Sequence, residues 1–246
     1  MKENFRPISN TAPSGVSGSI KFYARFIFDL QNFSIYIGLK RYLRPLKGRI
    51  LDMGCGDSPY RHLLNGGCEY IGADIEGQKS FDYDNCSIIR FKGGKLPLEN
   101  ISVDHIICTE VLEHVESFGK FVWEMRRVLK KGGTAFVTVP WSARYHYVPY
   151  DFFRYTPAAL AHIFGDFSSV EVVERGTDIT SICSKIIVAC ARCFTGFNAV
   201  KIILLPVSVV LALPLLAIAV IIGHLSLAAS LGSRQDPLGY TIFLKK

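Results

Sequence analysis

The fold is decided by Arg49-Ile50-Leu51-Asp52-Met53-Gly54-Cys55-Gly56, a short apolar run that breaks into a glycine turn. The apolar part predicts a strand buried in a parallel sheet, and the two glycines permit a tight turn that a ligand can approach closely. A second strand-like run, which ends in Asp74, follows about 20 residues later. This spacing predicts a carboxylate beside the ribose of a nucleotide-like ligand.

Two kinds of doubly wound protein share this pattern, those that bind dinucleotides and those that bind S-adenosylmethionine. A dinucleotide requires a third glycine and a helix N-terminus for its pyrophosphate, whereas here Asp57-Ser58-Pro59 follow the turn. An acid at this point opposes a pyrophosphate, but it suits the amino group and the sulfonium of S-adenosylmethionine. The residues therefore favour the methyl donor.

Three motifs then follow one another between residues 45 and 175. They are Leu51-Asp52-Met53-Gly54-Cys55-Gly56, Cys108-Thr109-Glu110-Val111-Leu112-Glu113-His114-Val115 and Arg127-Val128-Leu129-Lys130-Lys131-Gly132-Gly133. With these motifs the chain resembles the class I S-adenosylmethionine-dependent methyltransferases, in the large family that includes the ubiquinone-biosynthesis enzymes. The resemblance implies an α/β fold with a doubly wound, mainly parallel seven-stranded sheet in the order 3-2-1-4-5-7-6, whose seventh strand is antiparallel.

The strands of this sheet are predicted at 49–53, 69–74, 87–91, 103–108, 134–139, 170–174 and 240–245. The chain divides into a flexible tail (1–18), a methyltransferase domain with an N-terminal helix (19–177), an apolar helical insert (178–238) and the last strand (239–246). The N-terminal helix, from Ser19 to Leu43, has an aromatic and aliphatic side. It either packs beside the substrate cleft or lies on a bilayer as a basic amphipathic helix, and the two roles are compatible.

The insert contains Ile202 to Gly223, a run of 22 residues without a charge. As one straight helix it would be about 33 Å long, which is enough to cross a bilayer. The last strand must pair in the same sheet as Leu51, so the chain crosses a membrane an even number of times or not at all. A second crossing over Ile179 to Phe197 is disfavoured, because Lys185 and Arg192 lie in it.

We therefore expect Pro214 to divide the apolar run into two pieces, near 200–212 and 215–231, which enter the bilayer as a monotopic hairpin. The alternative is that these helices cover the domain or a dimer interface. The protein is accordingly predicted to associate with a membrane through this apolar insert, with its catalytic domain in the cytoplasm.

Charge and cysteine content support this localisation. The net charge is +7, and residues 1–49 carry the whole excess, which suits anionic lipid. We expect no nucleic-acid partner, because the excess charge lies away from the cleft. Seven cysteines without regular spacing indicate a reducing compartment. We predict no metal site, since Cys190 and Cys193 have no second ligand pair.

By resemblance, the turn lies along the methionine part of S-adenosylmethionine, Asp52 orients its amino group and Asp74 binds its ribose hydroxyls. The implied cofactor-binding residues are Asp52, Gly54, Cys55, Gly56, Asp74, Thr109 and Glu110. His114 is expected to be structural, bonded to a neighbouring backbone group. One stretch departs from the family, since Phe91-Lys92-Gly93-Gly94-Lys95-Leu96-Pro97 offers no acid for the adenine amino group.

The acceptor side is predicted in the segment from Pro140 to Thr156, which follows the fifth strand. His146 is the candidate general base. Asp151 either orients His146 or pairs with Arg154, and Arg154 either holds an anionic substrate group or fixes the loop, with Thr156-Pro157 capping the next helix. The catalytic candidates are His146, Asp151 and Arg154, and the aromatic substrate-binding candidates are Trp141, Tyr145 and Tyr155.

The sequence thus predicts an S-adenosylmethionine-dependent methyltransferase at the cytoplasmic membrane face that O-methylates an amphipathic or lipid-linked acceptor. Two alternatives stay open. One is a membrane-bound binding or scaffold protein without turnover, which the missing adenine acid favours. The other is a soluble methyltransferase that acts on a small molecule.

Overall fold

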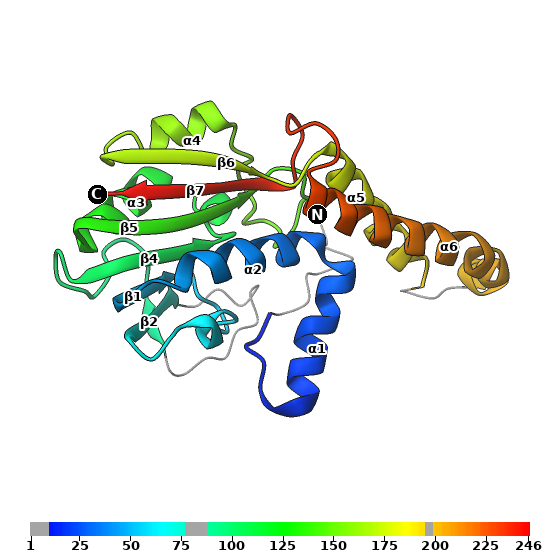
Figure 1. The fold of residues 1–246 in the computed structure, drawn as a ribbon, viewed down its shortest axis with the longest axis horizontal. Helices are drawn as coiled ribbons and strands as arrows, with labels where there is room; N and C mark the ends of the chain where they lie inside the picture. The colour runs from blue at the N-terminus through cyan, green and yellow to red at the C-terminus, as the bar shows by residue number, and fades with distance from the viewer. Residues whose placement is uncertain (1–9, 77–87, 195–198) are drawn as a thin grey trace.

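The computed structural model describes residues 10–76, 88–194 and 199–246, which form a seven-stranded sheet with helices on both faces (Figure 1). The sheet order is β3-β2-β1-β4-β5-β7-β6, as predicted. β7 runs antiparallel to β5 and β6, and the other pairs are parallel. The strands are β1 (Gly48–Met53), β2 (Cys68–Ile75), β3 (Ile89–Phe91), β4 (Val103–Thr109), β5 (Leu129–Pro140), β6 (Ser169–Arg175) and β7 (Gly239–Lys245).

Alternating side chains of the strands build two cores, one on each face of the sheet. On one face α1 (Gly15–Phe28) and α2 (Leu30–Leu43) pack against Ile50, Ile107 and Phe136. On the other face α3 (Phe118–Val128) and α4 (Pro157–Ile163) pack against Leu51 and Ile106. The sheet is therefore buried on both sides, which explains why its strands are apolar runs rather than alternating ones.

The N-terminal helix differs from the prediction of one helix over residues 19–43. Two helices are present, and α1 already begins at Gly15, inside the expected tail. The break is at Asp29, whose carboxylate accepts a hydrogen bond from the Asn32 amide at 3.0 Å and so caps α2. A capped helix start competes with helix continuation, because it satisfies an amide that would otherwise lack a partner. Residues 1–9 of the tail lie outside the described residues.

The connection from β1 to β2 contains a three-residue 3-10 helix, η1 (Arg61–Leu63), and no α-helix. The segment is short and holds Pro59, Gly66 and Gly67, which disfavour a longer helix. The glycine turn is consequently not followed by the α-helix N-terminus that a dinucleotide pyrophosphate requires. The local structure thus agrees with the choice of the methyl donor over a dinucleotide.

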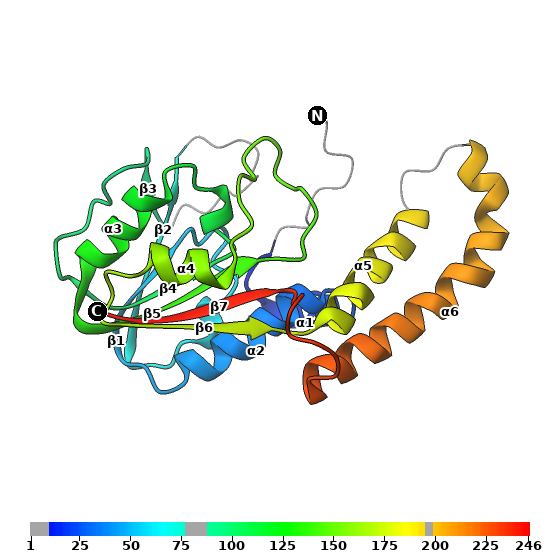
Figure 2. The same ribbon diagram turned by 90° about the horizontal axis from the view of Figure 1, so that it is seen from above.

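The insert forms two antiparallel helices, α5 (Asp178–Cys193) and α6 (Ala199–Ala229), which project beyond the edge of the sheet domain (Figures 1 and 2). The expected division at Pro214 is wrong, since α6 is one helix with Pro206 and Pro214 inside it. A proline removes one hydrogen bond and bends a helix without ending it, and Figure 2 shows α6 curved in its N-terminal half. Val209–Ala229 is long and apolar enough to span a membrane. Within it, 22% of an apolar stretch of 18 residues is buried.

The two ends of the insert are joined to each other. Thr177 and Thr180, at the start of α5, lie 2.8 and 2.7 Å from the hydroxyl oxygen of Ser226 near the end of α6. The amide of Asp178 donates to the carbonyl of Ser233 at 2.9 Å. The chain therefore leaves and re-enters the sheet domain on one side, as the antiparallel pairing of β7 requires.

Candidate functional site

The glycine turn after β1 is built so that only glycine fits at its first position. Gly54 has a φ of +81°, and a Cβ added there would lie 2.4 Å from a methyl carbon of Val111. The amides of Gly54 and Cys55 donate to the carbonyl of Ala73 at 2.8 and 3.2 Å, so the turn is held against the end of β2. The turn therefore stands at the carboxyl end of β1, where open α/β sheets bind their ligands.

Two carboxylates lie next to this turn. Asp74 accepts hydrogen bonds from the amides of Gly56 and Ile75, at 2.6 and 2.7 Å, and burial raises its pKa. An ionised carboxylate has about four acceptor positions, so two amides leave room for two further donors. Asp52 is buried and accepts a hydrogen bond from the hydroxyl of Tyr70 at 2.8 Å, and burial raises its pKa to about 7.

The other predicted cofactor residues have different surroundings. The Cys55 side chain is buried, with its sulfur 3.7 Å from the carbonyl of Gly56, so it offers a ligand its backbone rather than its thiol. Thr109 ends β4, and Glu110 follows it with a φ of +53°. The Glu110 carboxylate accepts hydrogen bonds from Arg175 at 2.8 Å and from Gln31 at 2.9 Å.

Arg175 is a buried residue that the sequence gave no reason to select. Its guanidinium lies at the end of β6 and also donates to the Gln31 carbonyl at 3.2 Å and to the Ser34 hydroxyl at 3.1 Å. It therefore joins β6, α2 and the loop after β4 at the edge where the predicted cofactor residues gather. No pattern marks such a residue, because its partners come from three distant segments.

The acceptor-side candidates His146, Asp151 and Arg154 form one connected group. Asp151 Oδ2 lies 3.0 Å from His146 Nδ1, and the Arg154 guanidinium binds both Asp151 oxygens at 2.6 and 2.8 Å. Asp151 thus contacts both predicted partners. Burial opposes ionisation of Asp151, but hydrogen bonds from Arg154 and His146 outweigh it and hold its pKa well below the usual range. Arg154 also donates to the Arg144 carbonyl, so its guanidinium fixes the loop.

The neighbouring helix and histidine behave as predicted. Thr156 accepts a hydrogen bond from the Ala159 amide and caps α4, whose first residue is Pro157. His114 Nδ1 lies 2.7 Å from the carbonyl of Tyr150, which is the backbone bond expected for it. Burial and the adjacent His146 lower the pKa of His114 to about 4, so its ring is neutral at neutral pH.

The three aromatic candidates lie in three different environments. Tyr155 is buried in the core, and its hydroxyl donates to the Leu112 carbonyl at 3.2 Å, so it supports the site from beneath rather than lining it. The Trp141 indole donates to Asp236, in the loop before β7, at 2.9 Å. Tyr145 is exposed. The loop from Lys92 to Lys95 is also exposed and, as the sequence indicates, contains no acid.

Comparisons with known proteins agree with this geometry. Residues 51–137 match a family model described as a methyltransferase domain. An uncharacterised protein of Methanocaldococcus jannaschii is 33% identical over 103 residues, which are 41% of this chain and 48% of that protein. A probable S-adenosylmethionine-dependent methyltransferase of Mycolicibacterium smegmatis is 31% identical over 98 residues, 32% of this chain and 38% of that protein.

The fold has counterparts among solved structures. A Thermotoga maritima protein described as an S-adenosylmethionine-dependent methyltransferase, possibly for histamine, is similar with a TM-score of 0.54 and 15% identity, over 92% of this chain and 96% of that one. The chain spans less than half the length of the curated relatives that it matches. The chain therefore has the sheet order of a methyltransferase fold, and its residues 51–137 match the model of a methyltransferase domain.

Proposed function

We propose that this protein transfers a methyl group from S-adenosylmethionine to an acceptor. The observation that carries the proposal is the position of Asp74 beside the turn, where a Cβ at Gly54 would clash with Val111. The Asp74 carboxylate keeps acceptor positions for two ribose hydroxyls. Asp52, whose pKa burial raises to about 7, suits the cationic amino group of the donor. The residues present therefore fit this cofactor.

The chemistry needs little from the protein beyond positioning and one proton transfer. The bound donor supplies an electrophilic methyl group, which an acceptor nucleophile attacks in line. We propose that His146 acts on the acceptor proton, because Asp151 and the Arg144 carbonyl hold its Nδ1 and leave Nε2 for the acceptor. A hydroxyl is the acceptor group that this arrangement suits, so O-methylation is the expected reaction.

Donor binding is tested by calorimetric titration of the full chain with S-adenosylmethionine. Replacing Asp74 with Ala removes two hydrogen bonds to a charged acceptor, worth about 3 kcal/mol together, so the dissociation constant should rise about 100-fold. Asp166→Ala, an exposed acid far along the chain, is the matched control. Folded wild-type protein that binds no donor would favour the scaffold alternative instead.

We also propose that the protein works at a membrane surface, on an amphipathic or lipid-linked acceptor. Most described side chains of α6 that face outward are large and apolar, among them Val210, Leu211 and Ile221. The C-terminal part of α6 packs on the domain, because a Cβ added to Gly223 would lie 2.5 Å from a side-chain carbon of Leu30. Lipid cannot surround such a helix along its whole length, which supports shallow monotopic insertion over a crossing.

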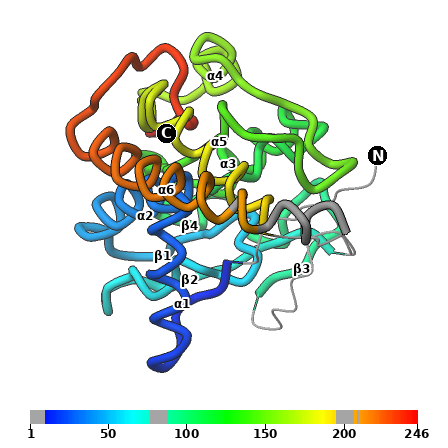
Figure 3. Tube along the Cα trace, turned by 90° about the vertical axis from the view of Figure 1, so that its right-hand side faces the viewer, coloured from blue at the N-terminus to red at the C-terminus, as the bar shows by residue number. Residues whose placement is uncertain are grey.

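Exposed apolar residues of the N-terminal helix α1 also support association with a membrane. Val16, Ile20 and Ile27 of α1 are exposed although they are apolar. Figure 3, which views the molecule from the end where α6 lies, shows α1 and α6 both toward the viewer. All cysteines described are free thiols, in keeping with a cytoplasmic domain.

Membrane association is tested by flotation of the full chain with vesicles of phosphatidylcholine and phosphatidylglycerol. Leu211→Glu places a charge on the exposed side of α6 and should release the protein from the vesicles. Trp123→Glu makes the same change at an exposed aromatic residue of α3, on the other face of the sheet, and should leave binding intact. Wild-type protein that stays in the aqueous fraction would favour the soluble methyltransferase or a dimer interface.

A further inference from the structure

Glu113, the middle residue of η3 (Leu112–His114), is a buried acid that the proposed donor and acceptor roles do not use. Its side chain is fully buried, and neither carboxylate oxygen has a hydrogen-bond partner among the described residues. An unpaired buried carboxylate is costly, because it loses its hydration without compensation. Such a group requires either a proton or a cation.

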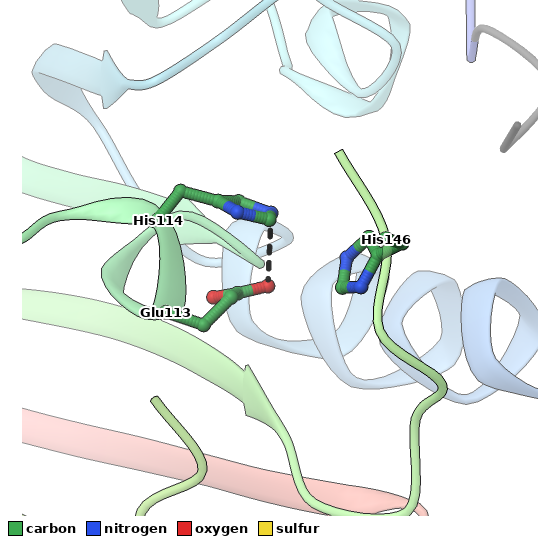
Figure 4. Close-up of side chains that lie close together, drawn as sticks. All are labelled: Glu113, His114 and His146. Carbon is green, nitrogen blue, oxygen red and sulfur yellow. Dashed lines mark ion pairs between the residues drawn. The ribbon is translucent and has the colours of Figure 1, made fainter. Parts of the chain in front are cut away.

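Glu113 points toward two imidazole rings (Figure 4). Glu113 Oε1 lies 3.6 Å from His114 Nε2, and the rings of His114 and His146 meet edge to face with centroids 4.9 Å apart. One ligand atom from each of these three residues lies within 4.8 Å of the others. The cluster joins the loop after β4 to the loop after β5, so it stands at the carboxyl ends of the central strands.

The hydrogen bonds of both histidines fix which ring nitrogen faces the cluster. His114 Nδ1 lies 2.7 Å from the Tyr150 carbonyl, and His146 Nδ1 lies 2.9 Å from the Arg144 carbonyl. A carbonyl only accepts, so each Nδ1 carries the hydrogen and each neutral ring keeps a lone pair on Nε2. One carboxylate and two imidazoles, each able to offer a ligand atom, therefore lie close together.

A proton alone does not join these atoms. The separation of 3.6 Å between Glu113 Oε1 and His114 Nε2 is too long for a hydrogen bond. It matches the separation of about 3.4 Å between two ligands of one tetrahedral ion, each bound at about 2.0–2.1 Å. Two imidazoles and one carboxylate form a ligand set that divalent transition metals prefer, and three ligands leave a position open.

We propose that Glu113, His114 and His146 bind a divalent transition-metal ion of the zinc type. The surrounding residues already have the arrangement of a metal site, because each histidine donates its other N–H to a carbonyl or carboxylate. The sequence predicts no metal, since Glu113 and His146 lie in different motifs and the fold alone brings them together. In the metal-bound form His146 would be a ligand, and the ion would replace it in the role of activating the acceptor that is proposed above.

This inference rests on the proposed methyl transfer and specifies its acceptor. The open position of the ion would bind the oxygen of a hydroxyl group, lower its pKa and so release its proton to solvent before the methyl group is transferred. The bond formed is between this oxygen and the methyl carbon, and the bond broken is between that carbon and the sulfonium sulfur. The acceptor class is therefore an alcohol or phenol that can ligate a metal.

The test is calorimetric titration of chelator-stripped, full-length protein with Zn²⁺, together with visible absorption after addition of Co²⁺. We expect one ion per chain and a cobalt band typical of nitrogen ligands. Glu113→Gln and His146→Gln should weaken zinc binding by more than about 100-fold, since even a residue that orients a ligand is worth 10–100-fold. His162→Gln, an exposed histidine of α4, should bind zinc as the parent does.

Glu113→Gln also separates ligand loss from misfolding. It replaces an unpaired buried acid with a neutral amide of the same shape, so the melting temperature of the metal-free variant should equal or exceed that of the parent. If this variant fails to fold, zinc binding is compared between the parent and His146→Gln, because His146 lies in a loop. The inference is overturned if the parent shows no saturable zinc binding, or if both variants bind zinc as tightly as the parent.

Donor titration distinguishes this inference from the proposed function. Metal-free protein and Glu113→Gln should bind S-adenosylmethionine with the affinity of the parent, because Asp74 and the glycine turn are not part of the cluster. A chain that binds zinc but no donor would retain the metal site and defeat methyl transfer. A chain that binds the donor but no zinc would retain the proposed methyl transfer and overturn the metal site.

Discussion

The proposed donor side and the proposed acceptor side of the site are built by different means. On the proposed donor side, the chain has a turn whose two glycines adopt positive φ, with two acids at the ends of adjacent strands, β1 and β2. On the acceptor side, side chains from two loops meet, and Asp151 and Arg154 hold them in place. The first side depends on backbone conformation, and the second depends on buried charge. Substitutions should therefore damage the two sides independently.

Arg154→Met should give the largest effect, on stability alone. It removes the cationic partner of the buried Asp151 carboxylate, which then keeps only its contacts with His146, and this costs about 3 kcal/mol in the free energy of unfolding. Donor affinity should not change. Denaturant unfolding and donor titration measure the two quantities, and Arg126→Met, an exposed arginine of α3, is the control. A parallel loss of donor binding would show that the two sides are coupled.

Gly54→Ala should lower donor affinity and leave the acceptor side intact. A residue with a Cβ is strained at a φ of +81° and would meet Val111 at 2.4 Å, which costs about 1–3 kcal/mol and displaces the turn. We expect donor affinity to fall at least about 10-fold, while the His146 loop keeps its structure. Gly66→Ala is the matched control, because nothing lies within 4 Å of a Cβ there. Equal affinities of the two variants would contradict a backbone-built site.

Donor affinity should rise with pH because of Asp52. Its pKa is raised to about 7 in the folded protein, so the carboxyl is protonated below this value and must ionise to hold a cationic amino group. Affinity should therefore increase up to about tenfold per unit of pH below 7 and level off above it. The same shift makes the unliganded protein less stable as pH rises from about 4 to 7. Titrations at several pH values check the prediction, and Asp52→Asn should abolish the dependence.

Tyr70→Phe should give the smallest effect and sharpen the same comparison. The Tyr70 hydroxyl donates to Asp52 and favours its ionised form, so loss of this bond should raise the pKa of Asp52 further. The expected change is about 1 kcal/mol, which moves the midpoint of the pH dependence upward by less than about one unit. Acceptor-side stability should not respond. A midpoint that moves downward would contradict the assignment of this titration to Asp52.

Local sequence signals were reliable where one short segment contains all that a feature needs. The positive φ angles of Gly54 and Gly56 are examples, and the family resemblance that the three motifs carry implied the sheet order that the structure has. Local signals failed where two effects compete at one residue. Asp29 caps a second helix where a continuous apolar stripe predicted a single one, and Pro214 bends α6 where its missing amide predicted a break.

The sequence by itself determined the seven strands, the glycine turn with Asp52 and Asp74 beside it, and an apolar insert whose ends return to one side. Each of these follows from neighbours in the chain, through apolar periodicity, the conformational freedom of glycine and the fixed hand of strand crossovers. Tertiary structure alone decided the Arg175–Glu110 pair and the meeting of Glu113, His114 and His146. These contacts depend on which loops the sheet brings together and on how completely water is excluded, and no stretch of sequence encodes either.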